Sequence, residues 1–185
     1  MHKLQTSKGF TLIEILIYIS ILLVMMALLS NLVIWIIGVK NQTRAERETQ
    51  QIARYVMEKL TQDIRSASSV DLNYSQFDQD PGTLLLNIDD STSAIYTVDD
   101  NEVLFYLRGD PDIIGLMSHQ QILAEAEPLI TADTKVKSLI FSYIAPENGP
   151  PNIPISFSLD YKTTSTKPLY QASIDLESAI SLRSY

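Results

Sequence analysis

The chain has 185 residues, of which 14 are basic and 22 acidic, and its net charge at pH 7 is −8. This length allows one soluble domain of ordinary size together with an anchor segment. An acidic protein repels phosphate backbones, so we expect no direct binding to nucleic acid. The absence of cysteine from the sequence excludes disulfide bonds and thiolate metal sites.

A short basic leader precedes a long apolar segment, residues 10–37, in which Glu14 is the only charged residue. Roughly 20 apolar residues of helix cross the hydrocarbon core of a bilayer, so the segment predicts a transmembrane helix. An ordinary secretory signal has a shorter apolar region with a small-residue cleavage site after it. Here the expected cleavage point, between Gly9 and Phe10, comes before the apolar segment. Cleavage there removes residues 1–9 and leaves the helix on the mature protein.

Glu14 is the anomaly in this segment, because a carboxylate at the edge of a membrane helix is costly. One interpretation is a residue at the helix N-terminus that the helix dipole favours near the lipid headgroups. The other is a functional residue that pairs with a cation in an apolar assembly. A buried carboxylate that loses its partner is an expensive lone charge, so such a pair would fix the register between subunits.

The sequence Lys8-Gly9-Phe10-Thr11-Leu12-Ile13-Glu14 resembles the type III signal of type IV pilins and of the pseudopilins of type II secretion. In that family a membrane peptidase cleaves after the glycine and methylates the new terminal amine, with S-adenosylmethionine as donor. The resemblance implies the following roles: cleavage between Gly9 and Phe10, N-methylation of Phe10, and assembly through Thr11, Leu12, Ile13 and Glu14. The cation for Glu14 is then the amine of Phe10 in a neighbouring subunit.

The resemblance also implies partners and a location. The partners are the prepilin peptidase and methyltransferase, other pilins or pseudopilins, the inner-membrane assembly platform and membrane lipid. The protein is expected to cross the bacterial inner membrane once, with its C-terminal domain outside the cytoplasm, before it joins a pilus or pseudopilus. The charges alone do not favour this orientation, because Lys40, Arg44 and Arg47 follow the apolar segment.

The helix is expected to continue beyond the membrane, from about Thr11 to Ser68. A stripe with spacings of three and four predicts an amphipathic half at residues 38–68. Gly38 is a weak point, costing about 1 kcal/mol relative to alanine. The stripe consists of Ala45, Thr49, Ile52, Val56, Leu60, Ile64 and Ala67.

Beyond Ser68 the apolar period changes to two, which is typical of half-buried antiparallel sheet. The predicted strands are Thr83–Ile88, Ala94–Val98, Glu102–Leu107, Val136–Ile144, Ile153–Tyr161 and Ala172–Leu182. His119–Glu127 is a candidate short helix. The expected fold class is therefore α+β, with a long N-terminal spine helix packed on a C-terminal antiparallel β-sheet, as in pilins. The extracytoplasmic β-rich domain would occupy residues 69–185.

Other chemistry is weakly represented. The sequence contains no phosphate-binding glycine loop and no Gly-x-Ser-x-Gly motif. His2 leaves with the leader, so His119 has no second histidine with which to bind a metal. Four aspartate pairs could suggest calcium, but none matches a full ligand loop, and aspartate is common in turns. The pairs are Asp78/Asp80, Asp89/Asp90, Asp99/Asp100 and Asp110/Asp112. We expect no enzyme activity, no catalytic residue, no cofactor and no metal.

Two short segments, Leu60–Ala67 and Ile180–Arg183, are similar to the helix end and the chain end of J-type minor pseudopilins and W-type minor pilins. The resemblance therefore favours a minor subunit, with a tip or priming complex as one place for it. Two alternatives remain: a major pilin of the same machinery, and a plain single-pass protein that anchors a binding or sensor domain.

Overall fold

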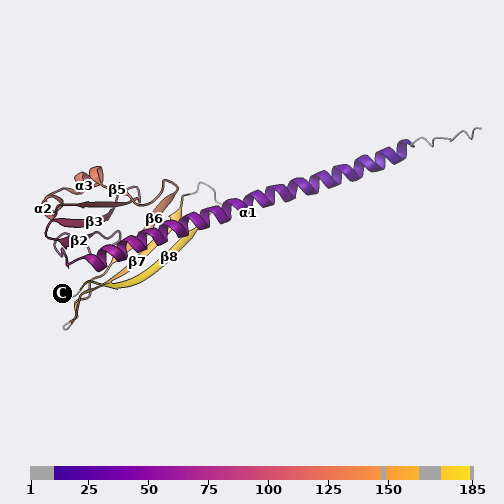
Figure 1. The fold of residues 1–185 in the computed structure, drawn as a ribbon. Coiled ribbons are helices and arrows are strands. Elements are labelled where there is room, and N and C mark those ends of the chain that lie inside the picture. Colours follow the sequence, from indigo (N-terminus) through magenta and orange to yellow (C-terminus); the bar gives the residue numbers. More distant parts are fainter. Residues whose placement is uncertain (1–10, 147–148, 163–171, 184–185) are drawn as a thin grey trace, which may run out of the picture. The chain divides into compact units, whose positions relative to one another are not determined.

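The structure is a computed structural model that describes residues 11–146, 149–162 and 172–183, and for residues 41 and 42 the backbone alone. The chain divides into two compact units, Met1–Asn41 and Gln42–Tyr185. The elements, shown in Figure 1, are α1 (Leu12–Ser66), β1 (Ser69–Val70), β2 (Leu84–Asp89), β3 (Thr92–Val98), β4 (Leu104–Gly109), α2 (Pro111–Ile114), α3 (His119–Glu125), β5 (Glu127–Pro128), β6 (Thr134–Phe141), β7 (Asn152–Tyr161) and β8 (Ser173–Ser181).

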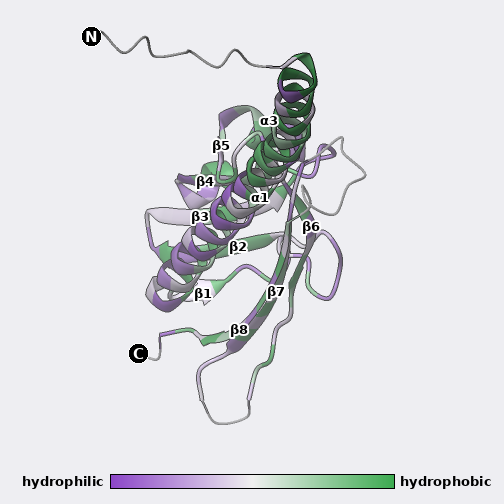
Figure 2. Cartoon of the chain, turned by 90° about the vertical axis from the view of Figure 1, so that its right-hand side faces the viewer, coloured by the Kyte–Doolittle hydropathy of each residue, from purple (hydrophilic) through white to green (hydrophobic). Residues whose placement is uncertain are grey.

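The predicted long helix is confirmed, with its ends at Leu12 and Ser66. No proline interrupts this stretch, so the backbone hydrogen bonds run on without a break. Figure 2 shows the hydropathy changing along α1, from mostly hydrophobic in its first half to largely hydrophilic in its second half. One helix thus contributes to both units.

The predicted antiparallel sheet is confirmed but divided in two. The strands β1 to β5 form a five-stranded sheet in chain order, and β6, β7 and β8 form a three-stranded sheet. All of the pairings are antiparallel. Alternation in the sequence indicates which face of a strand is buried but not which strand lies beside it, and for this reason the division was missed.

The six predicted strands correspond to β2, β3, β4, β6, β7 and β8, with ends that differ by a few residues. The candidate helix is confirmed as α3, which ends at Glu125. The sequence reading missed β1, β5 and α2, which are too short to show a period.

The second half of α1 packs on both sheets and forms the main core of the second unit. Leu60 and Ile64 of α1 belong to one buried cluster with Tyr96 of the five-stranded sheet and Phe157 of the three-stranded sheet. Of the predicted stripe, every residue is buried except Ile52, which is only half-buried. Ala53, which the stripe omitted, is fully buried instead.

The five-stranded sheet is covered on both faces. Leu85 and Ile95 form a second cluster with Ile114 of α2 and Ile122 of α3, on the face away from the main core. As a result β3 is buried at nearly every position. A strand that is covered on both faces has no reason to alternate.

Asp63 is a buried carboxylate in this core that the sequence did not single out. Its side chain is 5% exposed, and its Oδ2 accepts a hydrogen bond of 2.6 Å from the hydroxyl of Tyr96. Burial, and then the bond to Asp63, raise the pKa of Tyr96 well above its usual value. The neighbouring Tyr106 also has a raised pKa, chiefly because of burial, and Lys59 Nζ lies 3.8 Å from the centre of its ring.

Candidate functional site

The start of α1 is built by Thr11. Its carbonyl oxygen accepts hydrogen bonds from the backbone N–H groups of Glu14 and Ile15, at 3.1 and 3.3 Å. Its Oγ1 also accepts from the N–H of Glu14, at 3.4 Å. Thr-x-x-Glu is the spacing of a capping box, in which the threonine satisfies a free N–H group of the first helical turn. The motif therefore fixes where the helix begins.

Glu14 does not complete the capping box with its own side chain. Its Oε1 accepts a hydrogen bond of 3.2 Å from the hydroxyl of Tyr18, one helical turn further on. Residues at positions i and i+4 lie on the same face of a helix, so a single copy of the chain can form this bond without a partner subunit. The sequence reading missed Tyr18, although a polar hydroxyl four residues after the only charge in the segment was the signal for it.

The apolar residues around this pair face outward. Leu12 is 82% exposed and Ile13 is 65% exposed, and the remaining large apolar side chains up to Ile37 are exposed as well. Ser20 and Ser30 donate their hydroxyls to backbone carbonyls of the same helix, at 2.8 Å. Polar groups that are satisfied within the helix are what a hydrocarbon environment requires. Across the described residues, one helix is long and apolar enough to cross a membrane, and it is α1.

Of the predicted site residues, the structure brings Thr11 and Glu14 into contact and leaves Leu12 and Ile13 exposed. Gly9 and Phe10, the predicted cleavage and methylation positions, lie outside the described residues.

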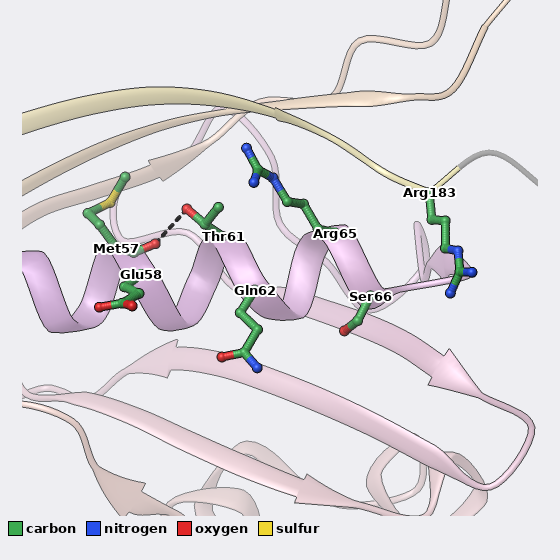
Figure 3. A pocket seen from close by; sticks show the side chains of 7 residues that line it. All are labelled: Met57, Glu58, Thr61, Gln62, Arg65, Ser66 and Arg183. Carbon is green, nitrogen blue, oxygen red and sulfur yellow. Dashed lines mark hydrogen bonds between the residues drawn. The ribbon is translucent and has the colours of Figure 1, made fainter.

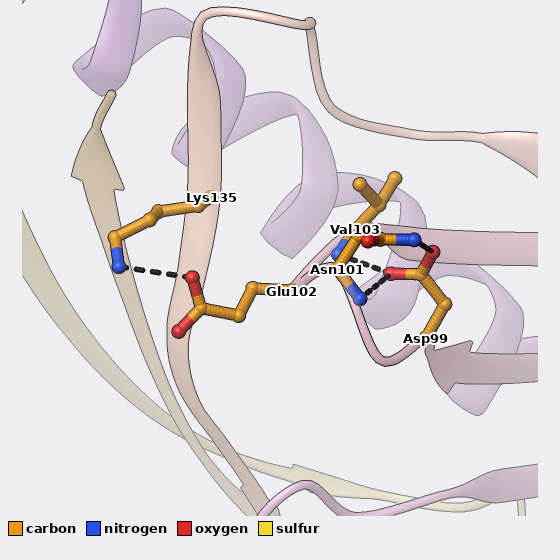
Figure 4. A network of polar contacts seen from close by, with 5 residues as sticks. All are labelled: Asp99, Asn101, Glu102, Val103 and Lys135. Atoms are coloured by element: carbon orange, nitrogen blue, oxygen red, sulfur yellow. Dashed lines mark hydrogen bonds and ion pairs between the residues drawn. The ribbon is translucent and has the colours of Figure 1, made fainter. Parts of the chain in front are cut away.

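The aspartates considered as calcium ligands accept hydrogen bonds from the chain itself, within local turns at Asp89, Asp99 and Asp110 and from residues 139–142 at Asp78 and Asp80. Asp99 accepts hydrogen bonds from the backbone N–H groups of Asn101 and Val103, as Figure 4 shows. Asp110 accepts from the N–H of Asp112 at the start of α2. Within the ranges that the structure covers, no three histidine, aspartate or glutamate side chains gather in a way that could hold a metal ion.

Asp89 shows how such a turn acts on a carboxylate. Its Oδ1 accepts from both the N–H and the hydroxyl of Ser91, at 2.9 and 3.0 Å. These bonds, the backbone one first, hold the pKa of Asp89 below its usual value. His119, the other residue that the sequence considered, is exposed at the start of α3.

The geometry at the start of α1 coincides with a recognised family signal. Residues 4–30 match the model of the prokaryotic N-terminal methylation motif. The match supports a prepilin-type N-terminal signal of the type IV pilin and pseudopilin family, with a methylation motif, signal cleavage and a transmembrane helix. No curated protein and no solved structure gives a match to the chain.

The motif carries several consequences. It implies processing by a prepilin peptidase and assembly with other pilins, and it points to a structural subunit and not to an enzyme. Together with the long apolar helix, it is consistent with anchoring in the inner membrane. The α+β layout, a long helix packed against antiparallel sheets, is consistent with a pilin-like fold.

Proposed function

We propose that the protein is a minor pilin or pseudopilin, a structural subunit of a type IV pilus or type II secretion pseudopilus. The observation that carries this proposal is the methylation motif at the start of a helix whose apolar half is uncovered. Residues 1–9 are the leader, which the peptidase removes after Gly9, and Phe10 is then methylated. The mature chain consists of a membrane and filament-core helix at 10–37, an amphipathic half at 38–68 and an extracytoplasmic domain at 69–185.

The force for assembly comes from the apolar half of α1. In the membrane its side chains contact lipid, and in a filament they contact the same half of other subunits. Packing against helices replaces lipid contacts with closer van der Waals contacts, which is how helices associate in apolar surroundings. The protein catalyses no reaction in this account, and it waits in the inner membrane with its body outside the cytoplasm.

Glu14 sets the register of assembly by pairing with the methylated amine of Phe10 in a neighbouring subunit. In the isolated chain its carboxylate is held by Tyr18. We propose that Tyr18 keeps the carboxylate partnered while the subunit is alone in the membrane, and that the amine takes over on assembly. The acceptor is ionised in both bonds, but the amine also carries a positive charge, so the exchange adds an attraction between opposite charges that favours the filament.

A minor position is supported by the two short resemblances at Leu60–Ala67 and Ile180–Arg183. Leu60, Ile64 and Ile180 contribute to the same core, so both segments belong to one folded region of the second unit. A subunit of this kind would join a tip or priming complex. A major pilin of the same machinery would share the N-terminal site and differ in its abundance in the filament.

The experiment replaces Glu14 in the native host and compares subunit recovery in sheared filaments by immunoblot. We expect Glu14→Gln to be cleaved normally but to fall at least about tenfold in the filament fraction, because one partner of a buried charge pair is lost. Glu125→Gln is the control, because Glu125 is an exposed carboxylate at the end of α3, and it should assemble normally.

Equal recovery of Glu14→Gln and the wild-type chain would remove Glu14 from the assembly mechanism. If the wild-type chain itself is never cleaved and never enters filaments, the result would instead favour a plain membrane-anchored binding or sensor domain.

A further inference from the structure

The two sheets have four edge strands, and three of these edges are protected against pairing with another chain. An open edge offers unpaired N–H and C=O groups, and proteins usually shorten or cover it. In the five-stranded sheet the edges are β1 and β5, with two residues each. Strands this short offer almost no template for a partner.

The third edge, along β6, is covered by the chain itself. The N–H of Gly82 donates to the carbonyl of Leu139 at 2.7 Å, and the N–H of Asp78 donates to the carbonyl of Phe141 at 2.8 Å. At the other end of the strand, the N–H of Val136 donates to the carbonyl of Glu102 at 2.8 Å. The outward groups of β6 are therefore largely occupied.

The fourth edge, β8, is long and regular. It has nine residues and pairs with β7 without any register shift. The ladder is flanked by bonds from Tyr161 N–H to the Ala172 carbonyl and from Leu182 N–H to the Pro151 carbonyl, at 2.8 and 2.9 Å. Hydrogen-bonded pairs alternate in an antiparallel ladder, so the even-numbered residues of β8 bond to β7.

The odd-numbered residues of β8 consequently direct their N–H and C=O groups toward the open edge. These are Ser173, Asp175, Glu177, Ala179 and Ser181. None of these backbone groups has a hydrogen-bond partner among the residues that the structure covers. The strand contains no proline, no lysine and no bulge that would discourage pairing.

The side chains of β8 differ between its two faces. Asp175 and Glu177 are exposed on the outer face. On the inner face Ile174 and Leu176 pack against the core but are only half-buried. The edge therefore combines an acidic outer face with apolar surface that the chain itself does not fully cover.

A groove of about 780 Å³ lies beside the end of this edge, lined by residues of α1 and by Arg183, which follows β8. Figure 3 shows Met57, Thr61 and Arg65 projecting from α1 on the side where β8 passes. Half-buried Met57 offers a flexible apolar surface there. Apart from Met57 the lining is polar or charged, so the groove suits polar side chains at the end of a strand added at β8.

We propose that β8 is a strand-addition site for an extended segment of another protein, in which apolar residues alternate with lysine or arginine. The main-chain groups of the odd-numbered residues would bond to the added strand, as in other cases of β-augmentation. Its basic side chains would face Asp175 and Glu177, and its apolar side chains would cover Ile174 and Leu176. Opposite charges across strands are stabilising and like charges are destabilising.

The same charges argue against a second copy of β8 as the partner. An antiparallel pair of two β8 strands centred on Glu177 would place the two Glu177 carboxylates directly opposite each other. The carboxylates of Asp175 and Glu177 favour instead a different segment with basic residues. This inference concerns the body alone and does not depend on cleavage of the leader, so either can fail without the other.

The test uses the purified full chain in detergent and two labelled nine-residue peptides, one alternating valine with lysine and one alternating valine with glutamate. We expect the lysine peptide to bind at least about tenfold more tightly than the glutamate peptide, measured by fluorescence anisotropy. Backbone amide exchange should then slow at the odd-numbered residues of β8, while the even-numbered amides are already slow in the free protein.

Ala179→Pro separates strand pairing from simple charge attraction. It removes an outward N–H and leaves the bonds to β7 intact, a position where proline is tolerated. We expect it to weaken binding of the lysine peptide at least about tenfold at unchanged protein charge. Ala179→Ser keeps the N–H and should bind like the wild-type chain.

The proposal is overturned if Ala179→Pro binds the lysine peptide as tightly as the wild-type chain, or if no odd-numbered amide slows. Should Ala179→Pro fail to fold by circular dichroism, the double variant Asp175→Lys/Glu177→Lys decides. It should reverse the preference and bind the glutamate peptide more tightly, and an unchanged preference would contradict the proposal.

Discussion

The two halves of α1 differ in what covers their apolar side chains. From Ala45 onward the apolar stripe is covered by the two sheets of the same chain, and Leu60 is completely buried. Between Leu12 and Ile37 the apolar side chains have no cover from the chain, and Leu28 is 64% exposed. Exposed apolar surface of that extent marks an interaction with lipid or protein.

This difference separates folding from assembly within one helix. The second half has its partners within the chain, so changes there should act on the stability of the body. The first half obtains its partners from the membrane or from other subunits, so changes there should act on insertion and assembly and leave the body intact.

The largest expected effect is on the stability of the body, and it compares the same substitution in the two halves of α1. Leu60→Ala should lower the free energy of unfolding of the body by roughly 2–5 kcal/mol, because it leaves a cavity in the core. Leu28→Ala, the same change in the first half, should leave that free energy unchanged. Chemical denaturation of the purified full chain in detergent, followed by tyrosine fluorescence, measures both. Equal effects of the two variants would contradict the separation.

The next effect tests the buried polar contact between the helix and the five-stranded sheet. Tyr96→Phe removes the donor of the 2.6 Å bond and leaves the Asp63 carboxylate without it. An unsatisfied buried acceptor costs roughly 1–3 kcal/mol, so unfolding should become easier by that amount. Tyr55→Phe is the control, since Tyr55 is 53% exposed and its change should be close to neutral. A neutral Tyr96→Phe would show that the contact does not hold the helix to the sheet.

The raised pKa of Tyr96 also predicts a pH dependence. Above pH 10 the unfolded chain releases the tyrosine proton, whereas the native state keeps it, because burial and Asp63 raise the native pKa. The contribution of Tyr96 to the free energy of unfolding is fully present below about pH 10. It falls as the pH rises above that value, by up to about 1.4 kcal/mol per pH unit. Denaturation midpoints between pH 8 and 11 should fall more steeply for the wild-type chain than for Tyr96→Phe. Parallel curves for the two proteins would refute this assignment.

The smallest effect concerns the surface ion pair between Lys135 and Glu102, at 2.9 Å (Figure 4). The hydrogen bond to Glu102 raises the pKa of Lys135, but the two side chains are 35% and 52% exposed. Solvent screens such pairs, so Lys135→Met should change the free energy of unfolding by less than about 1 kcal/mol. Lys137→Met is the control at a neighbouring exposed position. A loss comparable to that of Leu60→Ala would mean that the body depends on its surface charges.

Much of the architecture could be predicted because two regular periods are written in the sequence. The unbroken apolar segment and the stripe after it gave α1 almost to its ends, and strict alternation gave β7 and β8. Alternation failed at β3, where α2 and α3 cover the second face. The sequence predicted α3, but α2 has only four residues, which leave too little pattern to show a helical period.

At the start of α1 the sequence singles out residues by type and spacing but does not show the contacts between them. Thr11 and Glu14 stand out by type and spacing, whereas the bond from Tyr18 depends on the rotamers of two side chains. Asp63 was missed for a different reason: its partner Tyr96 is distant in the chain, and only the packing of α1 on the five-stranded sheet brings them together. Such pairs follow from tertiary structure and not from a local pattern.

The most direct test of the account is the mass and N-terminal sequence of the protein extracted from the membrane of its own host. The account predicts a mature chain that lacks residues 1–9 and begins at N-methylated Phe10. A chain that still carries Met1 to Gly9, in cells with an active prepilin peptidase, would contradict it and would leave a membrane-anchored domain outside the pilin pathway.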